Sequence, residues 1–573
     1  MKKKIDKNAS LGALYSCDAL GRLLPSEEQV GALRENRYVG IFYFLTSGCL
    51  RNGQPTPAPV NVSQVAKNHP EALKDYFHPA WRDENGMAGR PYSEEPLFGY
   101  YFQDDKWVLR RHVKMLTMAG IDFIAFDTTN YLTNWEEVRT LLEVLDEYHK
   151  EGWNVPKIAY YTNTDSGKRV QEIWNDLYKP NLFSHLWFRL DGKPFIIAKP
   201  DECTKEQQEF FTFRLPQWPI EQKKQGGFPW IDFNRPQDVW KDENGNNEIV
   251  AVSAAQHPTL SFSDTAFYGL EGARGRSYHN YKNDYSPEAI MYGYNAAEQW
   301  ERALELDPRI VFFTGWNEWA AGIHHRTADK EHPLLMVDNC DWEFSRDIEP
   351  MRGGHFDNYY LQLCDYVRRY KGAPKLPEKQ GYKTIDVEGD FSQWDKVDSE
   401  YYNMPFGTIH REAEGHGGVI YKDDTGRNEF DCLKVAHDKD NVYFYAKSRD
   451  KLSFNRIENC MSLLVGIANK PYEPHWHGYN YLINENSLDR THCFVKKSLG
   501  GYRFGRPTSA LYQLGEQEIM IAVSRKDLGI LEDGFELRFQ WIDHTCLDQT
   551  IESLYLHGDA APYGRFSFIY RAK

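Results

Sequence analysis

Residues 309–322 read RIVFFTGWNEWAAG, and the interpretation of the whole chain starts from this stretch. The apolar run at 310–314 is β-branched and aromatic, which predicts a short strand buried on both faces. It leads into the turn 316–319, where Glu318 stands between two tryptophans. Burial raises the pKa of a carboxyl group, as general acids and bases require, and indole faces suit a sugar ring. The alternative is that Glu318 is a structural partner of an arginine at the rim of a barrel.

The composition limits the classes of protein to consider. The chain has 573 residues, too many for one core, so at least two domains are expected. Its formal net charge of −15 argues against a nucleic-acid partner. No apolar stretch approaches the roughly 18 residues of a membrane span, so no membrane partner is expected. Aromatic residues make up 15% of the chain, a proportion found in sugar-handling proteins and in aromatic-rich β domains.

The N-terminus and the cysteines bear on localisation. The start, MKKKIDKNASLGALYSCDALGRLL, is basic but lacks an apolar h-region, so no signal peptide is predicted. The nine cysteines are scattered without metal-like spacing, which favours reduced thiols. We therefore expect a cytoplasmic protein, or a secreted or periplasmic one if a leader was removed. We expect no metal and no other cofactor.

Strand and helix patterns alternate over residues 1–372. This alternation predicts an α/β domain, specifically a (β/α)₈ TIM barrel, with an open doubly wound sheet as the competitor. No G-x-G-x-x-G or Walker motif follows an early strand, which favours the barrel. The predicted strands are 39–44, 121–126, 157–161, 186–190 with 194–198, 228–233, 249–255, 310–314 and 334–337, and helices are predicted at 104–119, 287–306 and 359–370.

The pattern changes after residue 372. Residues 373–381 are rich in Pro, Gly and Lys and are predicted to be a linker. Residues 382–573 carry period-two alternation, for example NVYFYAK at 441–447 and ELRFQW at 536–541, which predicts an all-β sandwich.

Three stretches of the first domain resemble glycoside hydrolase families 99 and 71. They are GYYFQDDKWVLRRHVKMLTMAGIDFIAFD at 99–127, WFRLDGKPFIIAKP at 187–200, and GWNEWAAG at 315–322, followed by IEP at 348–350. The resemblance implies a TIM barrel that acts on glycans. In the family 99 pattern a second Glu lies three positions after the one that Glu318 matches. Ala321 occupies that position here, so the two-acid mechanism of the family and its endo-mannosidase substrate do not transfer to this chain.

The C-terminal half resembles a family 9-like carbohydrate-binding, or DOMON-like, β-sandwich. The residues that carry the resemblance are IDVEGDFSQW at 385–394 and HDKDNVYFYAK at 437–447. It implies a carbohydrate-binding module. A purely structural domain that supports the barrel is the alternative. Trp476, Tyr479 and Tyr481 are the candidate binding platform in this domain.

Cleavage of a glycosidic bond normally needs two carboxyl groups. Glu318 is the first candidate, and Asp127 is the second because it directly ends an apolar strand, although it could instead cap the following loop. Asp165 follows the next strand and reads as a plain helix N-cap. Asp232 lies beside Trp230 and could face the barrel interior or pair with Arg235. Glu271 and Asp338 are weaker candidates, on loops that the sequence does not place.

The remaining candidates are substrate-binding residues. Trp230, Trp316 and Trp319 offer stacking surfaces, or are ordinary core residues. His257, at a strand end, and Asn317, beside Glu318, suit hydrogen bonds to sugar hydroxyls.

We therefore predict a glycoside hydrolase that acts on a poly- or oligosaccharide through Glu318 and a second carboxylate. The alternatives are a carbohydrate-binding protein on a barrel that has lost turnover, suggested by Ala321, and a glycan-processing transferase. The sugar, the linkage, the stereochemical outcome and the oligomeric state are left open.

Overall fold

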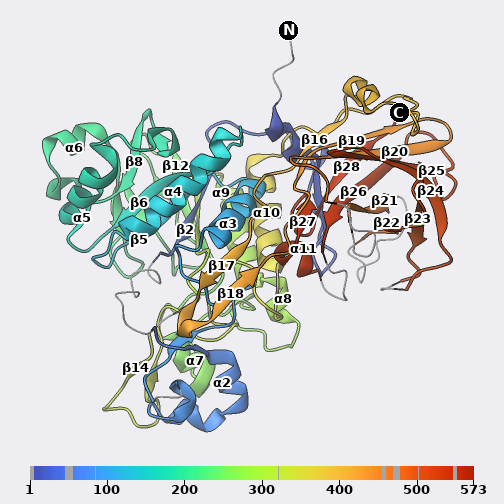
Figure 1. The fold of residues 1–573 in the computed structure, drawn as a ribbon. Coiled ribbons are helices and arrows are strands. Elements are labelled where there is room, and N and C mark those ends of the chain that lie inside the picture. The colour runs from blue at the N-terminus through green and yellow to red at the C-terminus, as the bar shows by residue number, and fades with distance from the viewer. Residues whose placement is uncertain are drawn as a thin grey trace.

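The computed structural model describes residues 6–45, 56–83, 86–320, 322–453, 460–468, 478–500, 503–545 and 551–573. Two large sheets dominate these residues (Figure 1). Helices surround the first sheet, and the second sheet lies beside it and holds most of the C-terminal half. Among the described helices, none has the length and apolar character that crossing a membrane requires.

The first sheet is barrel-like. Eight of its strands run parallel in the spatial order β10-β9-β8-β6-β5-β2-β13-β12. The two ends of this row, β10 and β12, contact each other, so the sheet curves back on itself. The eight strands are β2 (Tyr38–Tyr43), β5 (Phe123–Thr128), β6 (Lys157–Thr162), β8 (Lys193–Ile197), β9 (Thr212–Gln217), β10 (Gly227–Pro229), β12 (Asn247–Ser253) and β13 (Ile310–Thr314). Short antiparallel strands β7 (Arg189–Leu190) and β11 (Trp240–Lys241) pair with β8 and β12.

The sequence prediction of the eighth strand is wrong. Residues 334–337 contribute β15 (Leu334–Leu335), which pairs only with β14 (His324–His325) in a separate two-stranded sheet. Leu334 is buried, but in a small outlying core. The missing barrel strand is β9, and the polar residues and the proline of its sequence, TFRLPQ, hide its alternation. The barrel also departs from regular βα units, because no helix lies between β9 and β12.

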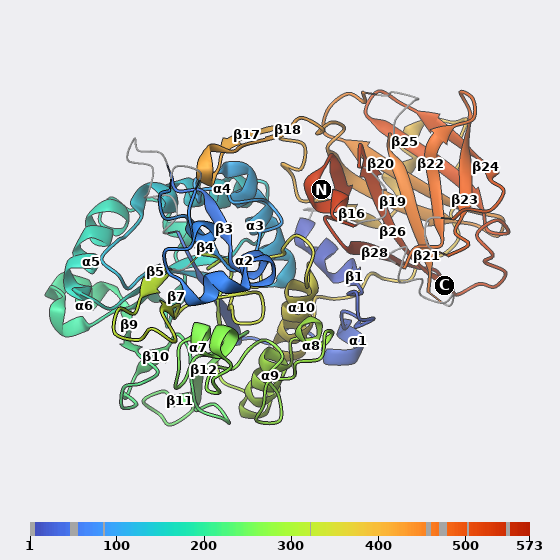
Figure 2. The ribbon, with the colours of Figure 1, turned by 90° about the horizontal axis from the view of Figure 1, so that it is seen from below.

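Helices cover the outside of the barrel (Figure 2). They include α3 (Lys106–Ala119), α4 (Trp135–Lys150), α5 (Ser166–Ile173), α6 (Lys205–Phe210), α9 (Tyr294–Leu306) and α10 (Asn358–Lys371). Helix α3 shows why these segments form helices. The Asp105 carboxylate accepts hydrogen bonds from the first turn, with Trp107 N at 3.0 Å, and Gly120 ends the helix in the left-handed conformation. The predicted helix 287–306 is instead broken at Gly293 into α8 (Ala289–Tyr292) and α9.

A small lobe extends from the barrel where α2 and α7 lie (Figure 1). It contains β3 (Pro59–Asn61), α2 (Val62–Asn68), β4 (Arg90–Tyr92), α7 (Phe262–Tyr268), β14 and β15. Its core includes Val62, Trp81 and Phe262, all buried.

The second sheet is antiparallel and has 12 strands among the described residues, in the order β1-β28-β26-β21-β22-β23-β24-β25-β20-β19-β16, with β27 paired to β26. They are β1 (Leu14–Ser16), β16 (Glu400–Tyr402), β19 (Phe430–His437), β20 (Asn441–Ser448), β21 (Ser462–Ile467), β22 (Tyr481–Ser487), β23 (His492–Lys497), β24 (Thr508–Leu514), β25 (Glu518–Ser524), β26 (Glu536–Asp543), β27 (Asp559–Ala561) and β28 (Phe566–Arg571). The helices α1 (Glu27–Val30) and α11 (Ser553–Leu556) are single turns.

The two halves are joined by more than the linker. The N-terminal strand β1, which the sequence-based boundaries assign to the barrel domain, pairs with β28 of the second sheet. A hairpin of β17 (Arg411–Glu414) and β18 (Ile420–Asp423) reaches the barrel (Figure 2). There Arg411 donates to Asp105 Oδ2 at 2.8 Å, and the Tyr421 hydroxyl accepts from the Tyr100 amide at 2.8 Å.

Candidate active site

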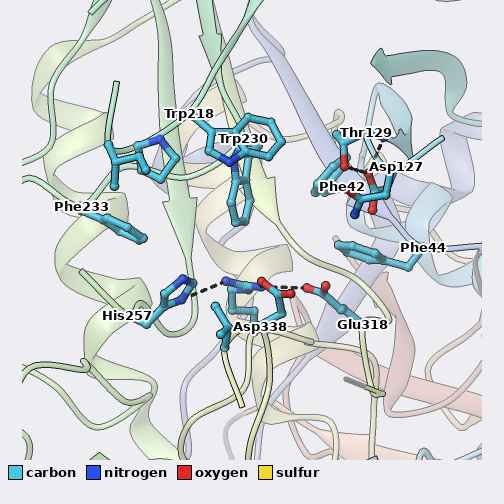
Figure 3. A pocket seen from close by; sticks show the side chains of 15 residues that line it. Phe42, Phe44, Asp127, Thr129, Trp218, Trp230, Phe233, His257, Glu318 and Asp338 are labelled. Carbon is cyan, nitrogen blue, oxygen red and sulfur yellow. Dashed lines mark hydrogen bonds and ion pairs between the residues drawn. The ribbon is translucent and has the colours of Figure 1, made fainter. Parts of the chain in front are cut away.

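A pocket of about 310 Å³ lies at the carboxyl ends of the parallel strands. Asp127 comes from the end of β5, Trp230 follows β10, His257 follows β12, and Glu318 follows β13. Figure 3 shows all four side chains around one cavity. Carboxyl ends of parallel barrel strands share one face of the sheet, so residues distant in sequence meet there.

Arg346 is the centre of the charged cluster. Its Nη2 lies 3.2 Å from Glu318 Oε2 and 3.1 Å from Asp338 Oδ1, and its Nη1 lies 3.4 Å from His257 Nδ1. The arginine side chain is only 1% exposed, whereas those of Glu318 and Asp338 are 16% and 56% exposed. Glu318 therefore pairs with an arginine, as the structural alternative expects, and also faces the cavity.

Backbone hydrogen bonds between the turn after β13 and a later loop position Arg346 at the pocket. The Gly315 amide donates to the Arg346 carbonyl at 3.3 Å, and the Ile348 amide donates to the Trp316 carbonyl at 3.1 Å. The turn after β13 and the later loop therefore run together. Asn339 fixes the turn as well, because its side-chain amide donates to the Glu318 carbonyl at 2.6 Å.

The electrostatics of the pocket favour the neutral form of Glu318. Burial raises the pKa of Glu318 well above its ordinary value, Arg346 opposes the shift, and the charges of Asp338 and Asp127 add to it. One guanidinium faces three carboxyl groups here, so the fully ionised state carries uncompensated negative charge. Burial, with the nearby Arg346 charge, lowers the pKa of His257 to about 4. His257 is therefore neutral at pH 7 and accepts from Arg346 at Nδ1, which leaves its proton on Nε2.

Asp127 is at the pocket wall and also organises its own loop. Its Oδ1 accepts from the Thr129 amide at 3.0 Å and from the Thr129 hydroxyl at 2.7 Å. Burial raises its pKa, although the two Thr129 hydrogen bonds oppose the shift. Asp127 therefore caps the following loop and also lines the pocket, and its catalytic role stays a prediction.

The walls of the pocket are aromatic. Trp230 packs against Trp218, with ring centroids 5.7 Å apart, and the Arg346 guanidinium lies 5.1 Å from the Trp230 ring centroid. Phe42 and Phe44 from the end of β2 pack edge to face at 5.0 Å. In Figure 3, Phe44 stands between Asp127 and Glu318.

Two of the three predicted stacking tryptophans do not line this pocket. Trp316 is fully buried in the barrel core, where it packs edge to face on His112 and Tyr360. Trp319 is 3% exposed, and its indole Nε1 donates to Glu349 Oε2 at 2.6 Å. The expectation that both indoles flank a sugar beside Glu318 is therefore wrong, and only Trp230 has the predicted position.

Three predicted polar residues also lie away from the cavity lining. Asn317 clamps the Phe44 backbone, because Oδ1 accepts from its amide at 2.9 Å and Nδ2 donates to its carbonyl at 3.1 Å. Asp232 is buried and accepts from the backbone amides of Asn234 and Asp238. It holds a loop rather than pairing with an arginine. Asp165 occupies the exposed N-cap position of α5.

Several residues that line the pocket were not predicted from the sequence. Arg346 was missed because an isolated arginine in a loop has no periodicity, although it lies two residues before the IEP stretch. The aromatic residues of the wall could have been found, because side chains at the carboxyl ends of barrel strands face the barrel mouth whether they are polar or aromatic. These residues are Phe42, Phe44 and Trp218.

The C-terminal sheet does not show the predicted binding platform. Tyr479 and Tyr481 are 4% and 1% exposed, and the Tyr479 hydroxyl donates to Gln540. Trp476 lies outside the described residues, as does Ala321. Within the described ranges, no group of His, Cys, Asp and Glu side chains has the arrangement of a metal site.

Comparison with known proteins gives a distant structural likeness. No family model matches the sequence, and no curated protein matches it. A solved structure of the GH99 endo-alpha-mannosidase from Bacteroides thetaiotaomicron aligns with a TM-score of 0.34 and 15% identity, over 58% of this chain and 97% of that chain. The same enzyme in complex with BIS-TRIS-propane gives a TM-score of 0.33 and 14% identity, with the same coverage. Nothing about activity follows from values this low.

Proposed function

We propose that this chain is a glycoside hydrolase and that Glu318 donates a proton to the glycosidic oxygen. The observation that carries the proposal is the position of Glu318, which faces an aromatic-walled pocket among two further carboxyl groups. Its raised pKa favours the protonated form that a general acid needs at neutral pH.

The second carboxyl group of the proposed mechanism is Asp127, with Asp338 as the competitor. It attacks the anomeric carbon or activates a water molecule while the glycosidic bond breaks. Glu318 and Asp338 bind the same Arg346 nitrogen at 3.2 and 3.1 Å, so the two bonded oxygens lie at most 6.3 Å apart, the sum of these distances. Carboxyl groups of retaining enzymes lie about 5–5.5 Å apart and those of inverting enzymes about 6.5–9.5 Å apart. A Glu318–Asp338 pair is therefore compatible with retention.

The ion pair with Arg346 supports a second candidate function. A carbohydrate-binding protein without turnover could also contain an acid that is neutralised by a buried guanidinium, as Glu318 is by Arg346. A glycan-processing transferase would use the same pair of carboxyl groups with a sugar hydroxyl in place of water.

A substrate screen tests these candidates. Wild type, Glu318→Gln, Asp127→Asn and Asp338→Asn are assayed on aryl glycosides and polysaccharides. Asp165→Asn serves as a matched control, because Asp165 is exposed and lies outside the pocket lining. We expect Glu318→Gln to lose about 10²–10⁴-fold in turnover, the usual contribution of a general acid. We expect Asp127→Asn to lose more than Asp338→Asn, and Asp165→Asn to match wild type.

Each other outcome selects an alternative. Equal turnover by wild type and Glu318→Gln would refute the site. Binding of a polysaccharide by both proteins without turnover would establish the carbohydrate-binding function. Products longer than the substrate would establish a transferase.

A further inference from the structure

A second buried arginine holds the loop that carries Arg346. Arg276 lies in the segment between α7 and α8 and is fully buried. Its Nε donates to the Trp342 carbonyl at 2.8 Å, and its Nη2 donates to the Ser345 hydroxyl at 2.8 Å and to the Asp347 carbonyl at 2.6 Å. The guanidinium of Arg276 therefore binds both residues that flank Arg346 in the chain.

Arg346 depends on such contacts because it lies in a loop, between β15 and α10. Backbone carbonyls in a buried loop lack the partners that a helix or a sheet supplies, so side chains have to donate to them. The planar guanidinium of Arg276 offers several donors in a fixed geometry, and it lies 4.6 Å from the Tyr359 ring centroid. Its Nη2 also forms an ion pair with the Asp347 carboxylate at 3.4 Å, which compensates that buried charge. The direction in which the Arg346 side chain leaves the backbone is thereby fixed.

The segment that carries Arg276 is anchored to the barrel. Gln256, just after β12, exchanges two backbone hydrogen bonds with Arg274, at 2.7 and 2.8 Å. The Arg276 amide donates to the Glu343 carbonyl at 3.0 Å. Arg276 therefore connects the end of β12 to the loop that carries Arg346.

We propose that Arg276 is a positioning residue that places the Arg346 guanidinium against Glu318 and His257. Arg276 lies behind the pocket lining and acts through Arg346, which belongs to the lining. The inference deepens the proposed function and takes its catalytic meaning from it, because Arg346 is the cation beside the proposed proton donor. The placement of Arg346 itself depends on no activity.

Arg346 acts on the protonation of both neighbours. Burial raises the pKa of Glu318, and Arg346 opposes that shift. Burial and, after it, Arg346 lower the pKa of His257 to about 4. Displacing the Arg346 guanidinium therefore raises both pKa values. The other charged groups that act on Glu318 or His257 are Asp127, Asp338 and Asp347.

Infrared titration of Glu318 tests the proposal. In each variant, the carbonyl band of Glu318 is isolated by subtracting the spectrum of the same protein with an added Glu318→Gln substitution. Arg276→Lys keeps the charge that compensates Asp347, but a lysine has a single donor nitrogen and cannot reproduce the bonds of the guanidinium fork. We expect the titration midpoint of Glu318 to rise by about one pH unit, because a nearby opposite charge lowers the pKa of a carboxyl group by about 1–3.

Arg368→Lys is the matched control. Arg368 is a buried arginine of α10 outside the pocket lining, and it too donates to backbone carbonyls, with Nη1 2.9 Å from that of Pro25 and Nη2 3.1 Å from that of Leu11. This variant is expected to lose stability as Arg276→Lys does and to keep the wild-type midpoint of Glu318. Ser345→Ala removes one acceptor of Arg276 and guards against misfolding of Arg276→Lys, and it is expected to shift the midpoint upward by less.

An upward shift in Arg276→Lys or Ser345→Ala, with the wild-type midpoint in Arg368→Lys, would support the proposal. A wild-type midpoint in both Arg276→Lys and Ser345→Ala, or an equal shift in Arg368→Lys, would overturn it. The midpoint in wild type tests the proposed proton donor, whereas the change between variants tests the role of Arg276. Failure of the proposed function is therefore distinguishable from failure of this inference.

Discussion

Glu318 and Glu349 lie in the two segments that run together after β13, yet their surroundings are opposite. Glu349 is fully buried, and donors surround it: His112 Nε2 lies 2.8 Å from Oε1, while the Tyr101 hydroxyl and the Trp319 indole donate to Oε2. Glu318 has one guanidinium partner and an open cavity in front of it. A carboxylate whose hydrogen-bonding capacity is filled from within the fold holds the fold together, whereas one left facing a cavity is available for chemistry.

The largest effect that this comparison predicts is on stability. Glu349→Ala leaves three buried groups without their acceptor, which costs about 3–5 kcal/mol of unfolding free energy. Urea denaturation measures this cost. Glu318→Ala is the paired variant, and its loss is expected to be clearly smaller because its side chain is partly exposed. Equal losses in the two variants would remove the distinction between them.

Trp316 and Trp230 allow the same comparison between a core residue and a pocket residue. Trp316→Ala empties part of the barrel core and is expected to cost about 3–5 kcal/mol. Trp230→Ala, at the pocket wall, is expected to cost about 1–2 kcal/mol, because only part of its surface is buried. Thermal or urea unfolding compares the two. If Trp230→Ala proved the more destabilising, Trp230 would be a core residue like Trp316.

A smaller effect concerns pH and the buried acid Glu343, which lies in the segment between Asp338 and Arg346. Burial raises its pKa to about 7, and its Oε1 accepts from the Ser277 amide at 3.1 Å. A raised carboxyl pKa stabilises the fold at low pH, and this contribution is lost as pH rises from about 4.5 through 7. Glu343→Gln keeps the acceptor but cannot ionise, so its stability relative to wild type is expected to increase from pH 5 to pH 8.

Urea unfolding at these two pH values provides the measurement. A difference in unfolding free energy between Glu343→Gln and wild type that stays constant from pH 5 to pH 8 would contradict the raised pKa. Asp165→Asn is the control, because Asp165 is exposed.

The fold was predictable where hydrophobic periodicity reports burial. Strands β2, β5 and β13 are apolar runs buried on both faces, and the sequence places each of them within about two residues. Strand β9 was missed because Arg214 pairs there with Glu248 of β12, an interaction with a partner distant in sequence. Residues 334–337 were mistaken for a barrel strand because an apolar run does not reveal which core it enters.

The sequence predicted the acidic residues of the candidate site better than its aromatic walls. Glu318, Asp127 and His257 follow strands that end at one face, so their position after a strand was sufficient. Trp316 and Trp319 flank Glu318 in sequence, but adjacent side chains in a turn point in different directions, and both indoles enter the interior. Arg346 could not be predicted, because its importance depends on the ion pairs that it forms with Glu318 and Asp338, and the sequence does not show these pairs.

The central claim is that the pocket holds Glu318 in its protonated form at neutral pH. The difference infrared spectrum between wild type and Glu318→Gln at pH 7 tests this claim without a substrate. We predict that the carbonyl stretch of a protonated carboxylic acid is present in wild type and absent in the variant. A difference confined to the carboxylate bands would show that Arg346 holds Glu318 ionised, and this result would contradict its role as the proton donor.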